Sequence, residues 1–180
     1  MPSPIGHALG GLICALAAGG PRPALGRAGP LRRVVHDPLV RVAAIAAVLP
    51  DLDFLWGRHN VETHSLGAAL AAGAVAWLAA GRREPRLAAV VTAAWASHVL
   101  FDWLGSDDTP PLGVMALWPL SSSFYFADAY VFAAISRRYW LAGFWPHNLW
   151  AVASEMAMLA PLAAALALWR GRPRPPDLRR

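Results

Sequence analysis

Residues 42–64 read VAAIAAVLPDLDFLWGRHNVETH, an apolar run followed by two aspartates and two histidines. The aspartates are Asp51 and Asp53, and the histidines are His59 and His64. Ionised Asp and neutral His are ligands for divalent metals. Charges placed directly after an apolar run are costly to bury unless something pairs them, and a metal ion would do so. If the segment is extended, the two aspartates point in different directions, so one binds directly and the other supports a ligand or binds a second ion.

Turn and cap chemistry is the alternative for the same stretch. Asp after Pro is common where turns and helices begin, and Thr63 or Asn60 could cap a helix that begins near Ser65. The rest of the chain must decide between the two interpretations.

The composition of the 180 residues is that of a membrane protein: 57% are hydrophobic, 15% are charged, and the mean hydropathy is +0.40. Nine tryptophans, several at the ends of apolar runs, fit interfacial belts. All 16 basic residues are arginines scattered between apolar runs, without the aromatic and basic groove of a nucleic-acid-binding protein. Cys14 stands alone, which excludes a disulfide framework and a thiolate zinc site. The first apolar run lacks a basic leader, so no cleavable signal peptide is expected.

Five apolar runs predict an all-α fold, a polytopic membrane bundle of about five helices in a single domain over residues 1–169. Residues 170–180 form an Arg/Pro-rich tail that we expect to be disordered. The alternative is a soluble, Ala-rich bundle, but three runs have almost no polar face. The runs cover residues 5–20, 38–49, 65–80, 86–104 and 148–169.

Arginine placement predicts the orientation of these helices. If all five runs cross the membrane, 13 of the 16 arginines fall on one side, which the positive-inside rule makes cytoplasmic. The N-terminus is then outside, the C-terminus is inside, and the polar motif residues gather at the outer end of the bundle.

Further candidate ligands lie at that same end. His98 and Asp102 are spaced i, i+4 and share one helix face, although a simple His–Asp hydrogen bond is the alternative. His7 stands in the first turn of the first run, and Glu155 is an isolated charge in the last run. His59 and His147 are weaker candidates. The combined set suits Zn, Mn or Fe in a mononuclear or dinuclear hydrolytic centre, with Asp53 or Glu155 as general base; it comprises His7, Asp51, Asp53, His64, His98, Asp102 and Glu155.

Several motifs together resemble the YdjM-like family, metal-dependent hydrolases of the bacterial inner membrane. The resemblance covers His7 to about Glu155, and it implies a membrane-bound hydrolase, in some members LexA-binding, with distant similarity to zinc-dependent phospholipase C. It also implies metal ligation by His7, Asp51, His64, His98 and Asp102, with Asp53 close by. The chain departs from the family in its 124–145 segment and in reading Arg58-His59-Asn60-Val61-Glu62 before Thr63. The motifs are Met1-Pro2-Ser3-Pro4-Ile5-Gly6-His7, Pro50-Asp51-Leu52-Asp53, Thr63-His64-Ser65, Ser97-His98-Val99-Leu100-Phe101-Asp102 and Leu117-Trp118-Pro119-Leu120-Ser121.

The sequence therefore predicts a metal-dependent hydrolase of phosphoesters or phospholipid-like substrates in the bacterial inner membrane, with its site on the extracytoplasmic side. Zinc is the expected ion, in one or two copies, and membrane lipids are the expected partners; oligomeric state stays open. A metal-stabilised scaffold or partner-binding protein is the second hypothesis. A transporter using His98, Asp102 and Glu155 as an ion path is the third.

Overall fold

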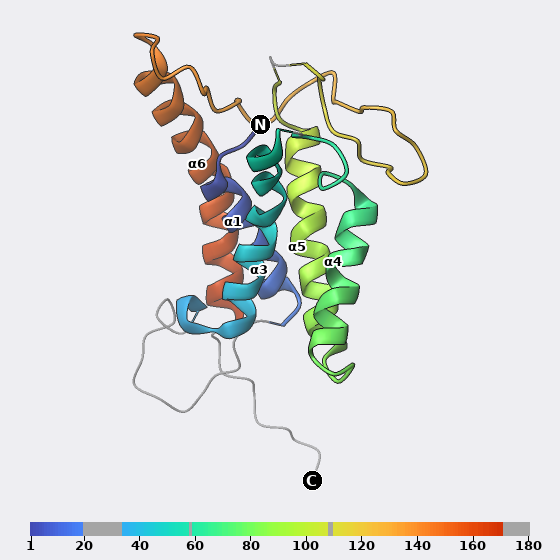
Figure 1. Cartoon of the computed structure of the whole chain (residues 1–180). Helices are drawn as coiled ribbons and strands as arrows, with labels where there is room; N and C mark the ends of the chain where they lie inside the picture. The colour runs from blue at the N-terminus through green and yellow to red at the C-terminus, as the bar shows by residue number, and fades with distance from the viewer. Residues whose placement is uncertain (20–33, 58, 108–109, 171–180) are drawn as a thin grey trace.

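The computed structural model describes residues 1–19, 34–57, 59–107 and 110–170 (Figure 1). In this part of the chain all regular structure is helical, and the two isolated β-bridges belong to no strand, which confirms the predicted all-α class. The helices are α1 (Pro4–Ala17), α3 (Pro38–Val48), the 3₁₀ helix η1 (Leu49–Trp56), α4 (Leu66–Ala79), α5 (Pro85–Trp103) and α6 (Phe144–Arg170).

Helix starts follow from local sequence. Ser3 and Asp37 cap α1 and α3 through their side chains, and each is followed by a proline, whose missing N–H costs nothing in a first turn. Ser65 caps α4 by accepting a hydrogen bond from the backbone N–H of Ala68 at 3.0 Å. The alternative that Thr63 or Asn60 caps this helix is therefore wrong.

Helix α1 lies at the centre of the bundle and contacts α3, α5 and α6. Its glycines permit this close packing, because a Cβ atom at Gly11 would lie 2.3 Å from the carbonyl oxygen of Ala43 in α3. Ala15 and Leu16 continue the same face into a buried apolar cluster with α3 and α5. Helix α4 packs only on α5, and α6 only on α1, among the described helices.

The helices run alternately up and down, so functional ends that are distant in sequence meet (Figure 1). The start of α1, the whole of η1, the end of α5 and the start of α6 lie at one end of the bundle, beside the long 105–143 segment. The α4–α5 turn and the end of α6 lie at the opposite end. This alternation carries the polar motifs to a common end of the bundle.

Helix α6 has the length and composition of a membrane span, and it is the one helix among the described residues that does. It begins at Phe144, so the predicted start at Asn148 is wrong; Pro146 lies in the first turn, where proline is tolerated. Helices α1 and α4 are apolar, but their 14 residues span about 21 Å, short of the roughly 30 Å hydrocarbon core. The structure thus supports one span directly, and the crossing of all five runs stays a prediction.

Candidate metal centre

Helix η1 directs the two aspartates of the Pro50–Asp53 motif to different partners. The segment is a 3₁₀ helix and not extended, and with about three residues per turn two positions in i, i+2 relation point about 120° apart. Asp51 faces His64 and His98, whereas Asp53 faces His59 and Thr63. The predicted divergence of the two carboxylates is confirmed, although the backbone geometry that produces it is helical.

Three histidines and two aspartates from separate elements converge at this end of the bundle. The carboxylate of Asp102 is the centre: its Oδ1 lies 3.3 Å from His7 Nε2, and its Oδ2 lies 3.0 Å from His98 Nε2 and 3.3 Å from His64 Nε2. Asp51 Oδ1 lies 3.6 Å from His64 Nε2 and 3.7 Å from His98 Nε2. The rings of His7 and His98 stack, with centroids 3.8 Å apart. Five residues that the sequence places in four segments therefore meet at this end of the bundle.

The facing atoms of this cluster lack hydrogen-bond partners among the described residues. The Nε2 atoms of His7, His64 and His98 and both carboxylate oxygens of Asp102 are buried and unsatisfied. These three rings are completely buried, and Asp102 is 1% exposed. Buried polar atoms are normally paired, so a group of them aimed at one point indicates a missing ligand. Two negative charges from Asp51 and Asp102 match one divalent cation.

Hydrogen bonds on the far side of two rings aim their Nε2 atoms at the cluster. His98 Nδ1 lies 2.7 Å from the carbonyl oxygen of Ala47, and a carbonyl can only accept, so Nδ1 carries the proton. His64 Nδ1 faces Asp53 Oδ2 at 3.1 Å in the same way. When the rings of His64 and His98 are neutral, each Nε2 has a free lone pair. Metal-binding histidines have the same arrangement, with a carbonyl or carboxylate partner behind the ring.

The spacing of the donor atoms also fits a metal ion. Two atoms bound tetrahedrally at about 2.0–2.2 Å from zinc lie about 3.3–3.6 Å apart. The His–Asp separations in the cluster run from 3.0 to 3.7 Å. The donor atoms of His7, Asp51, His98 and Asp102 all lie within 4.8 Å of one another. The residues present therefore fit a divalent metal in chemistry, in ring orientation and in distance.

A second group, formed by Asp51, His59 and His64, adjoins the first. His59 Nδ1 donates to Asp53 Oδ1 at 2.7 Å, and its Nε2 is buried without a partner among the described residues. Asp53 thus holds both His59 and His64. Asp51 is the residue that the two groups share, so it could serve an ion held by either of them.

Electrostatics outside the long helices reflect this crowding of charge. Burial opposes ionisation of Asp53, but hydrogen bonds from His59, His64 and Thr63 outweigh it and lower the pKa of the carboxyl group. The pKa of Asp51 is lowered in the same manner, with burial overcome by His64 and then by His98 and His7. For His64, burial is outweighed by Asp102, Asp51 and Asp53, which raise its pKa well above the usual value. Without a metal, a proton on His64 partly balances the carboxylates.

Two predicted site residues have other partners. Both carboxylate oxygens of Glu155 accept hydrogen bonds from Ser3, one from its backbone N–H at 2.8 Å and one from its hydroxyl. This contact joins α6 to the cap of α1, beside the cluster but outside both donor groups. His147 is exposed and lies 2.7 Å from the carbonyl oxygen of Ala134, also outside both groups.

Sequence reasoning missed the residues that support the ligands. Thr63 donates to Asp53 Oδ2 at 2.6 Å, while its own carbonyl accepts from Trp95 Nε1 at 2.8 Å. Ala47 contributes only a backbone carbonyl, which leaves no signal in the sequence. Ser3 could have been found, because Ser before Pro predicts a helix cap and Glu155 needed a partner.

The fold and the cluster define a helical membrane protein with a buried His/Asp centre at one end of its bundle. Comparison with protein families agrees: the family model of the YdjM inner membrane protein matches residues 1–172. The chain belongs to the YdjM inner membrane protein family. No curated protein and no solved structure matches it.

Proposed function

We propose that this protein is a membrane-bound, metal-dependent hydrolase acting on phosphoesters or phospholipid-like substrates. The observation that carries the proposal is the set of buried, partnerless Nε2 and carboxylate atoms around Asp102. His7, Asp51, His64, His98 and Asp102 would hold the ion, with zinc expected and manganese or iron as alternatives. A divalent metal so held activates water and polarises a phosphoryl oxygen.

Exposure assigns the reacting side of the centre. Asp51 is 21% exposed, whereas the other four proposed ligands are closed off. Its carboxylate is therefore the one that substrate and water can reach. Its Oδ1 faces the imidazoles of His64 and His98, so its Oδ2 could take up a proton from the attacking water. The base role predicted for Asp53 or Glu155 passes to Asp51 in this proposal, because hydrogen bonds occupy both oxygens of Asp53 and of Glu155.

The proposed place of action is the extracytoplasmic face of the bacterial inner membrane. Family membership and the apolar α6 support a membrane location. The multi-pass topology and the outward site rest on the arginine pattern of the sequence. Among the described residues, the α4–α5 turn with Arg82 and Arg83 and the end of α6 with Arg170 lie at the end opposite the cluster. A site at this level meets lipid head groups, which supports membrane lipids as partners.

A metal-stabilised scaffold is the second candidate, and the burial of four of the five ligands favours it. A structural site is coordinatively closed and its loss unfolds the ends of the helices it joins. A hydrolytic site keeps an open position. Transport has less support, because the polar groups cluster at one end of the bundle and do not follow a helix through it.

Metal content of the detergent-purified protein tests the proposal. We expect one or two equivalents of a transition metal in wild type, and loss of metal in His64→Ala and His98→Ala. His147→Ala is the matched control, because this exposed histidine lies outside the cluster. A wild type that is metal-free after gentle purification and does not bind added zinc or manganese would refute the metal centre and the hydrolase together.

Activity then separates the enzyme from the scaffold. Phosphodiester and phospholipid substrates are screened with wild type and Asp51→Asn. The enzyme proposal expects turnover that Asp51→Asn abolishes while the variant stays folded. A metal-bound wild type without turnover, whose helix ends melt when the metal is chelated, would favour the scaffold.

A further inference from the structure

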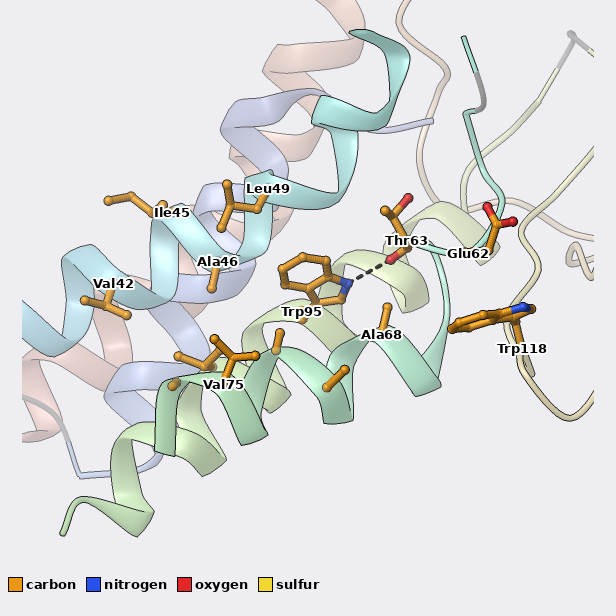
Figure 2. Close-up of a pocket in the computed structure, with 14 residues that line it drawn as sticks. Val42, Ile45, Ala46, Leu49, Glu62, Thr63, Ala68, Val75, Trp95 and Trp118 are labelled. Carbon is orange, nitrogen blue, oxygen red and sulfur yellow. Dashed lines mark hydrogen bonds between the residues drawn. The ribbon is translucent and has the colours of Figure 1, made fainter. Parts of the chain in front are cut away.

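An apolar groove of about 620 Å³ runs along the side of the bundle (Figure 2). Helix α3 from Val42 and Leu49 at the start of η1 form one wall, helix α4 forms the other from Ala68 to Ala76, and Trp95 of α5 lies between them. The groove exists because α3 and α4 both pack on α5 but do not contact each other.

One end of the groove adjoins the candidate metal centre. Thr63 lines this end together with Glu62 and Trp118 (Figure 2). The hydroxyl of Thr63 donates to Asp53, and the next residue is His64, a proposed ligand. Because Trp95 donates its indole N–H to the Thr63 carbonyl, the polar atoms at the junction are paired and the groove wall stays apolar. The groove and the centre therefore adjoin each other at Thr63 and His64.

The size of the groove suits a hydrocarbon chain. The α4 wall from Ala68 to Ala76 covers eight residue steps, which is a length of about 12 Å at about 1.5 Å per residue. The volume is within the range of about 300–1,000 Å³ that is usual for small-molecule sites.

The surroundings of the groove are as apolar as its interior. Ile45 and Val75, which line it, are 59% and 65% exposed. Nearby Leu70 on α4 is 66% exposed. A groove that opens sideways among such residues in a membrane protein faces lipid chains, and apolar cavities do not hold ordered water.

We infer that this groove binds the hydrocarbon tail of a membrane phospholipid whose phosphate head lies at the His/Asp centre. The inference names the substrate class of the proposed function and rests on that function for the fate of the head. Binding of the tail itself needs neither the metal nor catalysis. The two parts can therefore be tested separately.

The test is photo-crosslinking in detergent micelles with phosphatidylglycerol that carries a diazirine near the end of one acyl chain. Crosslinked residues are mapped by mass spectrometry in wild type, in Ala72→Trp, which fills the groove, and in Asp102→Asn, which removes a proposed ligand. Ala164→Trp is the matched control, because Ala164 is an exposed alanine of α6, far along the chain from the groove. Unlabelled phosphatidylglycerol serves as competitor.

We expect crosslinks on α3 and α4 that saturate, that yield to competitor, and that Ala72→Trp abolishes. Ala164→Trp and Asp102→Asn should keep them. If wild type gives only non-saturable crosslinks spread over all apolar helices, or if a folded Ala72→Trp labels as wild type does, the inference is overturned. The mapping in wild type decides even if Ala72→Trp does not fold. A wild type that labels in the groove but binds no metal and turns over no phospholipid would refute the proposed function alone.

Discussion

Replacing Asp53 by asparagine tests whether this carboxylate orients ligands or binds the metal itself. In the structure Asp53 Oδ1 accepts from His59 Nδ1 at 2.7 Å. Its Oδ2 accepts from the Thr63 hydroxyl at 2.6 Å and faces His64 Nδ1 at 3.1 Å. Neither oxygen is left over for a metal ion, so we expect Asp53 to act on the centre through the two imidazoles.

An amide in this place can serve only one of the two rings. Its NH₂ group must face either His59 or the Thr63–His64 side, and a ring that meets a donor has to move its proton from Nδ1 to Nε2. The lone pair of that ring is then lost to the metal. His98 keeps its orientation because the carbonyl of Ala47 holds it independently. The centre should therefore be weakened and not destroyed.

The expected magnitude follows from the supporting role. Loss of a partner behind a metal-binding histidine lowers metal affinity about 10–100-fold, which corresponds to about 1.4–2.7 kcal/mol. We expect this loss for Asp53→Asn, with the metal stoichiometry unchanged at saturation. For Asp102→Asn, which removes the central carboxylate, we expect no measurable site.

The assay is competition between the metal-stripped protein in detergent and a chromophoric zinc chelator. Asp128→Asn is the control, because Asp128 is an exposed carboxylate in the long segment before α6. Wild-type affinity in Asp53→Asn would refute the orienting role. Complete loss of binding, as in Asp102→Asn, would show that Asp53 is a ligand, as the sequence also allowed.

Three further predictions concern Glu155, the core and the topology. Glu155→Gln replaces one acceptor of the buried Ser3 hydrogen bonds by a donor, which should cost about 1–3 kcal/mol of stability. The zinc stoichiometry should stay the same; loss of zinc would show that Glu155 is a ligand. Gly11→Ala should destabilise the bundle by about 1–3 kcal/mol, measured by thermal unfolding, because its methyl group meets the backbone of α3. Gly143→Ala is the control: its methyl group meets nothing within 4 Å, so this variant should unfold at the wild-type temperature. In a chain without its native cysteine, Asp128→Cys at the site end should react with an impermeant thiol reagent in intact cells and Arg83→Cys should not; the reverse would contradict the outward site.

The sequence predicted the helices and the meeting of their polar ends for one physical reason. Successive apolar runs joined by polar connections alternate in direction, so motifs at every second connection share an end. His7, Asp51, His64, His98 and Asp102 come together on this basis, from segments up to 95 positions apart in the numbering. Their helical spacing and their polarity in an apolar context were visible without any structure.

What the sequence could not assign is which polar group faces which. Asp51 and Asp53 are the same residue type two positions apart, and only the 3₁₀ geometry of η1 decides that one faces the cluster and the other faces its supporting rings. Glu155 looked like a ligand because nothing adjacent in sequence neutralises it, but Ser3 at the far end of the chain donates a hydrogen bond to each of its two oxygens. Such pairings depend on side-chain direction across helices, which periodicity does not encode.

The groove was equally invisible, because it arises from a contact that does not form. Both α3 and α4 are rich in alanine, and nothing in either sequence says that they remain apart while packing on the same partner. The indole of Trp95 lies between the two helices at the level of Thr63 and donates a hydrogen bond to the Thr63 carbonyl. The same residue thus keeps the groove apolar and anchors the loop that carries His64. The tail groove and the metal centre are built on one shared support, so a change at Trp95 should disturb both.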